Sequence, residues 1–506
     1  MAQIVSGGAT TRVASLPAPI GGWNAAVDLG NLPSNQALVL DNWIPRSGWV
    51  EMRRGYQEHA TAHLGAVESL MAWDNGSSTK LLSASNNGKV FDITSAGVVG
   101  SPLVTGLTSA RFQHVNFRGY LFAVNGQDTP GRYNGTTWTD PGFTGAGLVP
   151  ANLIGVAAHK SRLFFIERDS ANYWYAPVNN ITGALSKVEL SGLAPEGGNL
   201  MAIGTWTRDG GAGSDDLAVF LFSSGNCLVY SGTDPGSASS WSLVGLFRIG
   251  RPLGRRCLLR AGSDLIAVTE EGYLSLSKVL PMDRLHRENA LSRSIEGAVL
   301  EATRTQAATF GWQGVLHPRN GVALFNVPVG SGVFHQHVLN TATGAWCRFT
   351  GQQALCWSTC GEELYFGTSA GTVFKADVGT ADNNTNIQAD ARTGFHRFGY
   401  NGVKRFTMIR PVMASEGRLP VSIGFDTDFA DHPNTFQAST ISSAGSPWNT
   451  SPWNSSPWQR GVSISAEWQS VSGVGYTAAV RLRTETKYQS VRWHALEVRY
   501  EPGGGL

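Results

Sequence analysis

The stretch Leu81-Leu-Ser-Ala-Ser-Asn-Asn-Gly-Lys-Val-Phe91 decides the fold, because it holds one complete copy of a motif that recurs along the chain. In this motif an apolar strand enters a turn rich in Gly, Asn and Ser, and a second strand with Val, Tyr or Phe follows. Seven copies begin at Leu81, Leu121, Leu163, Val219, Leu265, Val322 and Leu364, spaced by 40, 42, 56, 46, 57 and 42 residues.

The spacing of the copies is typical of β-propeller blades, which repeat every roughly 40 to 50 residues with about four strands each. A single hairpin cannot bury both of its faces, so such units stack on one another around an axis. We therefore predict an all-β protein containing a β-propeller of six or seven blades. The alternative is a long sandwich of unrelated hairpins.

Two parts of the chain depart from the repeat. Residues 282–304 carry apolar side chains at helical spacing, which predicts one helix inserted between blades. This helix contacts either a neighbouring subunit or its own propeller. Around residues 379–390 the chain turns polar, and strands then resume without the motif. We therefore predict three parts. An N-terminal arm (residues 1–60) packs on the propeller, the propeller covers residues 61–390, and a smaller C-terminal β-sandwich or barrel covers residues 391–506.

A tandem repeat lies in the C-terminal region, in a loop over residues 446–458 that contains Ser-Pro-Trp three times. Proline at every fifth residue excludes a helix and a central strand. Tryptophans on an otherwise polar loop are costly to leave in water. Trp448, Trp453 and Trp458 are therefore expected to contact a partner chain, the same loop of another subunit, or the flank of their own domain. An interface with a subunit or partner is the favoured interpretation.

Charge and composition limit the class of protein. Only 15% of the 506 residues are charged, whereas 61 are Gly and 16 are Trp. Few charges and many aromatic residues are typical of surfaces that contact partners. The net charge is +2, from 39 Lys and Arg against 37 Asp and Glu, which argues against a dedicated nucleic-acid-binding protein but not against a channel that DNA passes.

Local basic clusters nevertheless exist. Arg251, Arg255 and Arg256 form one cluster, and Arg53 with Arg54 forms another. Clusters of this kind usually form a solvated face or salt bridges between subunits, and we expect the same here.

The cysteines and histidines do not predict a disulfide framework or a metal site. Five cysteines are an odd number at low density, which predicts buried free thiols. Cys356 and Cys360 are too far apart in an extended strand to share a metal ion. His335 and His337 lie on one strand face without a third ligand near them, so strand histidines are the better interpretation.

The sequence shows no pattern typical of a secretory signal or a membrane helix. The N-terminal residues lack the charged and apolar segments of a secretory signal. No apolar run approaches the roughly 20 residues of a membrane helix. We therefore expect a protein that is made soluble in the cytoplasm.

No motif predicts catalysis. The stretch from Gly131 to Trp138 matches the Gly, Thr and Trp of a turn found in propeller glycosidases, but Gly131 and Tyr133 replace its Ser and Asp. Adjacent carboxylates such as Asp215 and Asp216 point to opposite faces of a strand and make a poor pair for glycoside hydrolysis. A phosphate loop, H-E-x-x-H and G-x-S-x-G are absent. We expect no catalytic residue, no metal and no cofactor.

The N-terminal stretch has an unusual sequence. It contains Pro19–Asn24 (PIGGWN), Leu32–Leu40 (LPSNQALVL), Asp41–Pro45 (DNWIP) and Gly48–Tyr56 (GWVEMRRGY). These strings resemble the opening of propeller-type tail proteins of short-tailed bacteriophages (podoviruses), which are called nozzle, tail tube or tail hub proteins. The close resemblance covers about 40 residues, and the repeated body resembles those proteins in architecture only.

This resemblance implies a structural virion protein: a homo-hexameric tail nozzle, assembled in the host cytoplasm, that surrounds and gates the DNA ejection channel. It implies attachment to a head–tail adaptor protein, support for tail fibre proteins, and passage of phage DNA without sequence-specific binding. The alternatives are a carbohydrate-binding or glycoside-hydrolysing β-propeller, which needs convergent carboxylates or aromatic residues in a pocket, and a monomeric cellular scaffold.

Several residues are candidates for interfaces or anchors. Tryptophans of the N-terminal stretch are expected to anchor the arm on the propeller, and the basic pair that follows them adds charge. The candidate interface residues are Trp23, Trp43, Arg53, Arg54, Trp448, Trp453 and Trp458.

Overall fold

The computed structural model describes residues 11–26, 29–209, 214–279, 289–330, 332–417, 419–430, 437–441 and 462–503. The chain divides into two compact units, each built from segments that are distant in the sequence. The larger unit contains Glu58–Gln336 and Gln352–Ala376, and the smaller unit contains Met1–Gln57, His337–Gly351 and Asp377–Leu506.

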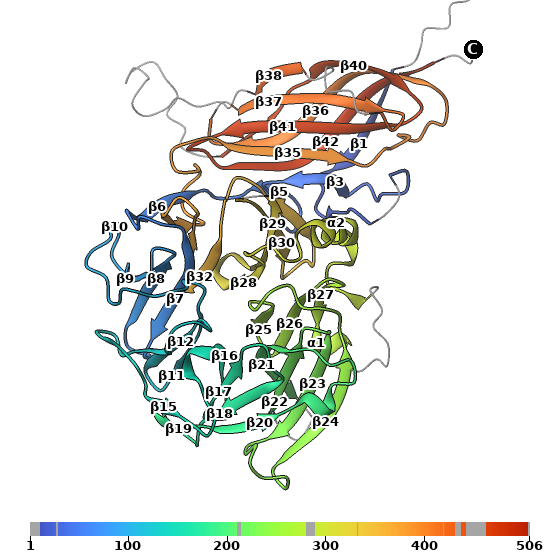
Figure 1. Ribbon diagram of the computed structural model, residues 1–506. Coiled ribbons are helices and arrows are strands. Elements are labelled where there is room, and N and C mark those ends of the chain that lie inside the picture. Colours follow the sequence, from blue (N-terminus) through green and yellow to red (C-terminus); the bar gives the residue numbers. More distant parts are fainter. Residues whose placement is uncertain are drawn as a thin grey trace, which may run out of the picture. The chain divides into compact units, whose positions relative to one another are not determined.

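The larger unit consists mainly of small sheets in which consecutive strands of the chain pair in antiparallel fashion (Figure 1). The first three sheets contain β7 (Val67–Asp74), β8 (Thr79–Ser85) and β9 (Lys89–Asp92); β11 (Gln113–Phe117), β12 (Tyr120–Val124), β13 (Gly131–Tyr133) and β14 (Trp138–Thr139); and β16 (Leu153–His159), β17 (Arg162–Glu167), β18 (Asn172–Tyr175) and β20 (Ser186–Glu189). The next two sheets contain β21 (Leu200–Asp209), β22 (Ser214–Phe222), β23 (Asn226–Gly232) and β24 (Trp241–Arg248); and β25 (Leu258–Ala261), β26 (Asp264–Thr269) and β27 (Gly272–Ser275). Then β28 (Gln313–His317) and β29 (Val322–Gly330) are followed in their sheet by β30 (Val333–Asn340), and β32 (Cys356–Cys360), β33 (Glu363–Gly367) and β34 (Val373–Ala376) share a sheet with β6 (Tyr56–Thr61) and β10 (Gly97–Val98). A short parallel pair is formed by β15 (Phe143–Thr144) and β19 (Gly183–Ala184).

The sequence motif accounts for these sheets. Its copies begin within β8, β12, β17, β22, β26, β29 and β33, and each of these strands pairs with the strand that precedes it along the chain. Side chains on both faces of these strands are buried, as in β17 and β26, which is why the copies read as continuous apolar runs. Gly88 has a φ of 78° in the turn between β8 and β9, a conformation that glycine adopts without strain.

The sheets of the larger unit form a closed ring. In the described part of the chain, the first strands contact one another in the cycle β7, β11, β16, β21, β25, β28, β32 and back to β7. Apolar clusters fill the spaces between neighbouring sheets; Tyr173 of β18, for example, packs on Phe220 of β22 with ring centroids 4.8 Å apart. Sheets that stack around an axis in this way form a β-propeller.

A short helical region follows β27. Helix α1 spans Leu276–Val279, and a single 3₁₀ turn (Arg293–Ile295) leads into α2 (Glu296–Gln306). Residues 282–288, the first part of the helix predicted over 282–304, lie outside the described residues. Val299 and Ala302 of α2 are buried, and the helix contacts β27 and β29 of its own unit. Among the described residues, no helix is long and apolar enough to cross a membrane.

The smaller unit is a β-sandwich. One sheet contains β1 (Arg12–Pro17), β4 (Trp43–Pro45), β5 (Val50–Met52), β36 (Lys404–Ser415), β39 (Ser463–Ala466), β40 (Gln469–Gly475) and β42 (Val491–Pro502). The other contains β2 (Gly22–Trp23), β3 (Gln36–Asp41), β31 (Trp346–Phe349), β35 (Ile387–Thr393), β37 (Leu419–Thr427), β38 (Gln437–Ile441) and β41 (Ala478–Thr486). Phe406 of β36 packs on Phe425 of β37 with ring centroids 4.7 Å apart, which joins the two sheets face to face.

The N-terminal arm predicted over residues 1–60 belongs to this sandwich. β1 pairs along its whole length with β42, and β3 pairs with β35. The predicted boundary at residue 390 falls inside β35, so the sandwich begins earlier than expected. Both differences have one cause: strands from opposite ends of the chain complete the same sheets, and local sequence patterns do not report that pairing.

The five cysteines are free thiols, and four of them are buried as expected, whereas Cys360 is half-buried. Cys227, Cys257, Cys347 and Cys356 are buried, and burial raises the pKa of each of these thiols. A thiol with a raised pKa remains protonated at neutral pH and is a poor nucleophile.

Candidate functional site

Two neighbouring cavities lie at the centre of the propeller. The narrower one, here named the axial cavity, has a volume of about 240 Å³. Every first strand of the cycle contributes to its wall, through Leu70, His114, Val156, Ile203, Leu258, Gln313 and Trp357. A cavity that all of these strands share lies on the axis of the ring.

The wider one, here named the arginine cavity, has a volume of about 500 Å³ and shares Gln113, Met201, Arg255 and Arg256 with the axial cavity. Four arginines line it, and no aspartate or glutamate does. The polar part of its wall consists of Arg111, Arg168, Arg255, Arg256, Gln113, Asn125, Gln127, Ser109 and Thr309. The wall is therefore positively charged and rich in hydrogen-bond donors.

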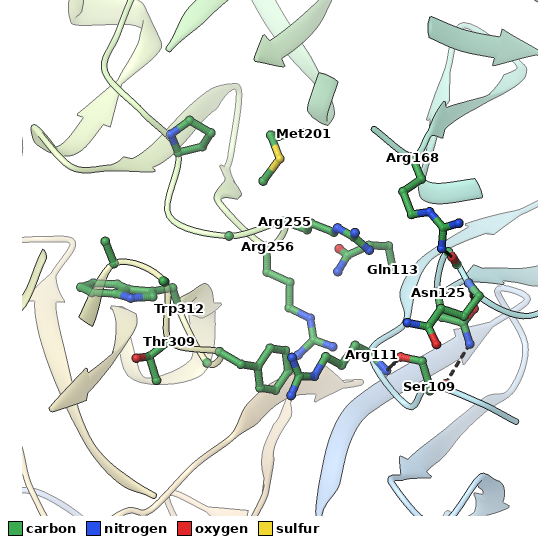
Figure 2. Close-up of a pocket in the computed structure, with 18 residues that line it drawn as sticks. Ser109, Arg111, Gln113, Asn125, Arg168, Met201, Arg255, Arg256, Thr309 and Trp312 are labelled. Carbon is green, nitrogen blue, oxygen red and sulfur yellow. Dashed lines mark hydrogen bonds between the residues drawn. The ribbon is translucent and has the colours of Figure 1, made fainter. Parts of the chain in front are cut away.

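The four arginines reach the cavity from three segments that the ring brings together (Figure 2). Arg111 precedes β11, and Arg168 follows β17. Arg255 and Arg256 lie between β24 and β25, directly after Gly254, which has a φ of 75°. Glycine adopts this positive φ without strain. The chain can therefore turn at Gly254, and the turn places two consecutive arginines at the cavity.

Arg256 is held firmly in place. Its Nη2 donates hydrogen bonds to the Ser69 hydroxyl (2.6 Å) and to the backbone carbonyls of Glu68 (3.0 Å) and Phe112 (3.2 Å). All three acceptors are uncharged, so they orient the guanidinium without neutralising it. Burial lowers the pKa of Arg256, and the charge of Glu68 opposes this effect only in part.

Arg111 lies beside Arg256 on a shared aromatic ring. The guanidinium carbons of Arg111 and Arg256 are 4.2 and 5.4 Å from the centre of the Phe310 ring, a geometry that allows cation–π attraction. Arg111 also donates to Glu68 Oε1, with a distance of 3.0 Å from Nη2. Glu68 is thus the partner of one guanidinium of this pair.

Arg168 is oriented mainly by neutral groups. Its Nη1 donates to the Gly126 carbonyl (2.7 Å) and its Nη2 to the Asn152 side-chain oxygen (3.0 Å). Its nearest carboxylate is that of Asp169, at 3.7 Å from Nε, and that side chain is 82% exposed. Such an exposed pair contributes little charge compensation.

Arg255 is the least compensated residue of the cavity. Within the described residues its side chain makes no hydrogen bond and no ion pair. Burial lowers the pKa of Arg255, and the nearby charges of Arg168 and Arg111 lower it further, against the opposing effect of Asp169. Its guanidinium group extends towards Gln113 in Figure 2.

His114 adds no charge to the centre of the ring at neutral pH. Burial, together with the positive charge of Arg256, lowers the pKa of His114 to about 4. The imidazole is neutral at pH 7, and Arg256 supplies the positive charge next to it.

The structure places the candidate interface residues of the N-terminal stretch inside the smaller unit. Trp43 is fully buried and packs edge-to-face on Trp493, and Trp23 donates from Nε1 to the Leu38 carbonyl. Arg53 is 2% exposed. These three side chains therefore support the sandwich core and do not form an exposed surface.

The other candidates divide into two groups. Arg54 is exposed and remains accessible to a partner. Trp448, Trp453 and Trp458 lie outside the described residues, so their interface role stays a prediction.

Arg53 is the centre of a buried polar network. Nη1 and Nη2 donate to the two carboxylate oxygens of Asp382 at 2.7 and 2.6 Å, and Nε donates to Asn42 at 2.7 Å. The Nη2 group also donates to the Thr350 carbonyl at 2.9 Å. Asn42 adopts a positive φ of 61° and donates to the Gln388 carbonyl, so the signature string is tied to three distant segments.

The basic cluster Arg251, Arg255 and Arg256 is split by the fold. Arg251 is exposed, as expected of a solvated face, whereas Arg255 and Arg256 line the central cavities. Sequence reasoning noted these arginines but missed the cavity, because Arg111 and Arg168 come from other sheets and carry no local signal. Only the closure of the ring brings them together.

Residues considered for catalysis or metal binding have structural partners. The Gly131–Trp138 stretch forms β13, a turn and β14, and Asn134 accepts hydrogen bonds from the backbone of Thr136 and Thr137 in that turn. Asp215 accepts hydrogen bonds from Lys160 and Ser231. In the described ranges, no group of three or more His, Cys, Asp or Glu residues is arranged to hold a metal ion.

Comparison with known proteins gives distant structural similarity only. No protein-family model matches the chain, and no curated protein matches its sequence. A computationally designed protein, Ika8, aligns over 64% of this chain and 100% of its own, with 12% identity and a TM-score of 0.38. BBS1N, solved in complex with ARL6DN, aligns over 67% of this chain and 100% of its own, with 13% identity and a TM-score of 0.41. The sheets of this chain and the contacts between them define the propeller by themselves.

Proposed function

We propose that this chain is a structural virion protein of a short-tailed bacteriophage, a tail nozzle that assembles as a homo-hexamer around the DNA ejection channel. The ring attaches to a head–tail adaptor protein and carries tail fibre proteins. It assembles in the host cytoplasm and gates the channel through loops that change position. It conducts DNA without sequence-specific contacts and catalyses no reaction.

The observation that supports this proposal is the role of the N-terminal signature in the smaller unit. Asn42 and Arg53, both within the signature, meet Asp382 in one buried network, and Trp43 packs on Trp493. Buried polar networks demand complete satisfaction, so the residues that build one are difficult to replace separately. The strings that resemble phage tail proteins therefore contain residues on which the fold of the smaller unit depends.

An exposed apolar strand of the propeller favours assembly. In β24, Leu243, Val244 and Leu246 are 43%, 48% and 40% exposed. β24 is the last strand of its sheet, which has the order β21-β22-β23-β24. Proteins usually protect such edges with charges or cover them with a partner, and these three positions carry no charge. We assign β24 to a contact between subunits.

The carbohydrate-hydrolysing alternative requires two carboxylates that face each other across a cleft. The linings of the axial and arginine cavities contain no aspartate or glutamate. The centre of this propeller therefore favours a role without glycoside hydrolysis.

The direct test is reconstitution of the tail. The purified chain is mixed with a complex of portal and adaptor and imaged by electron microscopy. We expect a ring of six subunits below the adaptor. A chain that stays unbound, or that binds as separate monomers, would contradict the proposal.

A pair of variants tests the assigned edge in the same assay. Val244→Lys places a charge among the exposed apolar side chains of β24, and we expect it to prevent assembly of the hexamer. Val98→Lys is the matched control, because Val98 is 76% exposed but lies in β10 (Gly97–Val98), which belongs to another sheet. Rings that form equally well with both variants would exclude β24 as the contact.

A further inference from the structure

We propose that the arginine cavity, which adjoins the axial cavity, binds a small organic oxyanion through a carboxylate or phosphate group. This site goes beyond the structural role proposed above, and it requires neither the hexamer nor an adaptor protein. The inference rests on charge balance, on the orientation of the arginines and on the size of the cavity.

The positive charges at the cavity exceed the negative charges around it. Glu68 pairs with Arg111, and the exposed carboxylate of Asp169 is 3.7 Å from Arg168. Arg255 and Arg256 form no ion pair within the described part of the chain. Partly buried cations that repel one another are unfavourable unless an anion joins them. The cavity therefore provides the electrostatic conditions for an anionic ligand.

The donors are oriented before any ligand arrives. Arg256 is fixed by its three neutral acceptors and by Phe310, as Arg111 is fixed by Glu68 and the same ring. Guanidinium groups present parallel donors that match the two oxygens of a carboxylate or phosphate. Binding at preoriented donors avoids much of the entropy cost of ordering long side chains.

Unused donors also line the cavity. The side chains of Arg255, Gln113 and Gln127 make no hydrogen bonds to described residues. Arg255 and Gln113 line both cavities, so they lie where the arginine cavity meets the axial cavity. One free guanidinium and two free amides suit an anion attached to a polar body with hydroxyl groups.

The volume selects the size of the ligand. About 500 Å³ is much more than a single phosphate ion occupies, and it falls within the range of roughly 300 to 1,000 Å³ typical of sites for small organic molecules. A sugar acid or a sugar phosphate combines the charge, the hydroxyl groups and the size that this lining fits.

Isothermal titration calorimetry with the full-length chain tests the inference with three ligands that share one ring. Glucuronate carries a carboxylate, glucose 6-phosphate carries a phosphate, and glucose carries neither. We expect at least one of the two anions to bind and glucose not to bind, and the stronger anion identifies the preferred group. Inorganic phosphate is expected to compete with the anion that binds.

Variants assign the binding to the cavity. Arg255→Gln removes the uncompensated charge, and we expect it to weaken binding by about tenfold or more, since hydrogen bonds to charged groups are strong. Arg304→Gln is the control, because Arg304 is exposed on α2 and does not line the cavity. Arg255→Lys keeps the charge without the planar fork, and an intermediate affinity is expected.

The fold of the variants is checked by thermal denaturation without ligand. Arg255 makes no bond to described residues, so Arg255→Gln is expected to melt at the wild-type temperature or above it. The inference is overturned if neither anion binds, if glucose binds as well as the anions, or if Arg255→Gln binds like the wild type.

Discussion

Arg53 shows at the scale of one residue how the smaller unit depends on its N-terminal stretch. Both oxygens of Asp382 bind this guanidinium, and the two side chains are 1% and 8% exposed. Asp382→Asn leaves the arginine charge buried without its counter-ion. We expect a loss of about 3 to 5 kcal/mol in the free energy of unfolding, measured by urea denaturation with tryptophan fluorescence.

An exposed pair in the same unit provides the control for that measurement. Arg405 and Glu501 are 4.0 Å apart, and their side chains are 73% and 34% exposed. Glu501→Gln is expected to cost less than about 1 kcal/mol. Equal effects of the two substitutions would show that the Arg53 network does not stabilise the sandwich.

His159 predicts how the stability of the propeller depends on pH. Burial, followed by the charge of Lys160, lowers the pKa of His159 from 6.5 to about 4, and the side chain is 3% exposed. As the pH falls, His159 takes up its proton in the unfolded chain at a higher pH than in the folded chain. The contribution of neutral His159 to the free energy of unfolding is therefore complete above pH 6.5 and is lost as the pH falls towards 4. The loss is on the order of 3 kcal/mol for this group.

Chemical denaturation between pH 7.5 and pH 4 measures this effect, by the linkage between protonation and unfolding. His159→Gln cannot take up the proton, so its stability is expected to fall less steeply over the same window. His114 titrates in the same direction and contributes equally to both proteins. Parallel curves for the wild type and the variant would contradict the role of His159.

The residues whose roles the sequence did not reveal have partners far away along the chain. Arg53 and Asp382 are 329 positions apart, and the carboxylate has no motif of its own. Arg111 and Arg168 reach the same cavity as Arg255 only because separate sheets close into a ring. A basic cluster is visible in a sequence, but its burial depends on elements elsewhere in the chain.

The hairpin is the element that the sequence predicts best. Each copy of the motif joins two strands through a short turn, so all its signals lie within a few residues of one another. The sequence predicted an N-terminal arm on the propeller and did not reveal that β1 pairs with β42 at the other end of the chain. Helix α2 begins at Glu296, directly after a 3₁₀ segment at Arg293–Ile295, whereas the predicted start of the inserted helix lies outside the described residues.

Gly131 tests the packing within one such hairpin. β13 and β14 pair through Tyr133 and Trp138, which brings the indole of Trp138 over Gly131. A Cβ atom at position 131 would lie 1.9 Å from this indole. Gly131→Ala therefore forces the indole to move, and we expect a loss of about 1 to 3 kcal/mol in unfolding free energy. Gly100→Ala is the control, because a Cβ there meets no atom within 4 Å.

At the scale of the whole molecule, the chain has two cores with different origins. The propeller core consists of clusters between consecutive sheets, as between β7–β9 and β11–β14. The sandwich core is completed by strands from both ends of the chain, and Leu16 of β1 and Leu496 of β42 are both buried in it. Repetition made the first core predictable from the sequence, whereas the second core has no repeat to reveal it.

Two cores predict two unfolding transitions, because a compact unit with its own core usually unfolds cooperatively. In differential scanning calorimetry, Asp382→Asn is expected to lower the transition of the sandwich and Gly131→Ala that of the propeller, each leaving the other unchanged. The double variant would then show the sum of the two shifts, as expected for sites without shared partners. If both substitutions lower a single transition, the units unfold as one cooperative structure, and the division into two cores has no thermodynamic meaning.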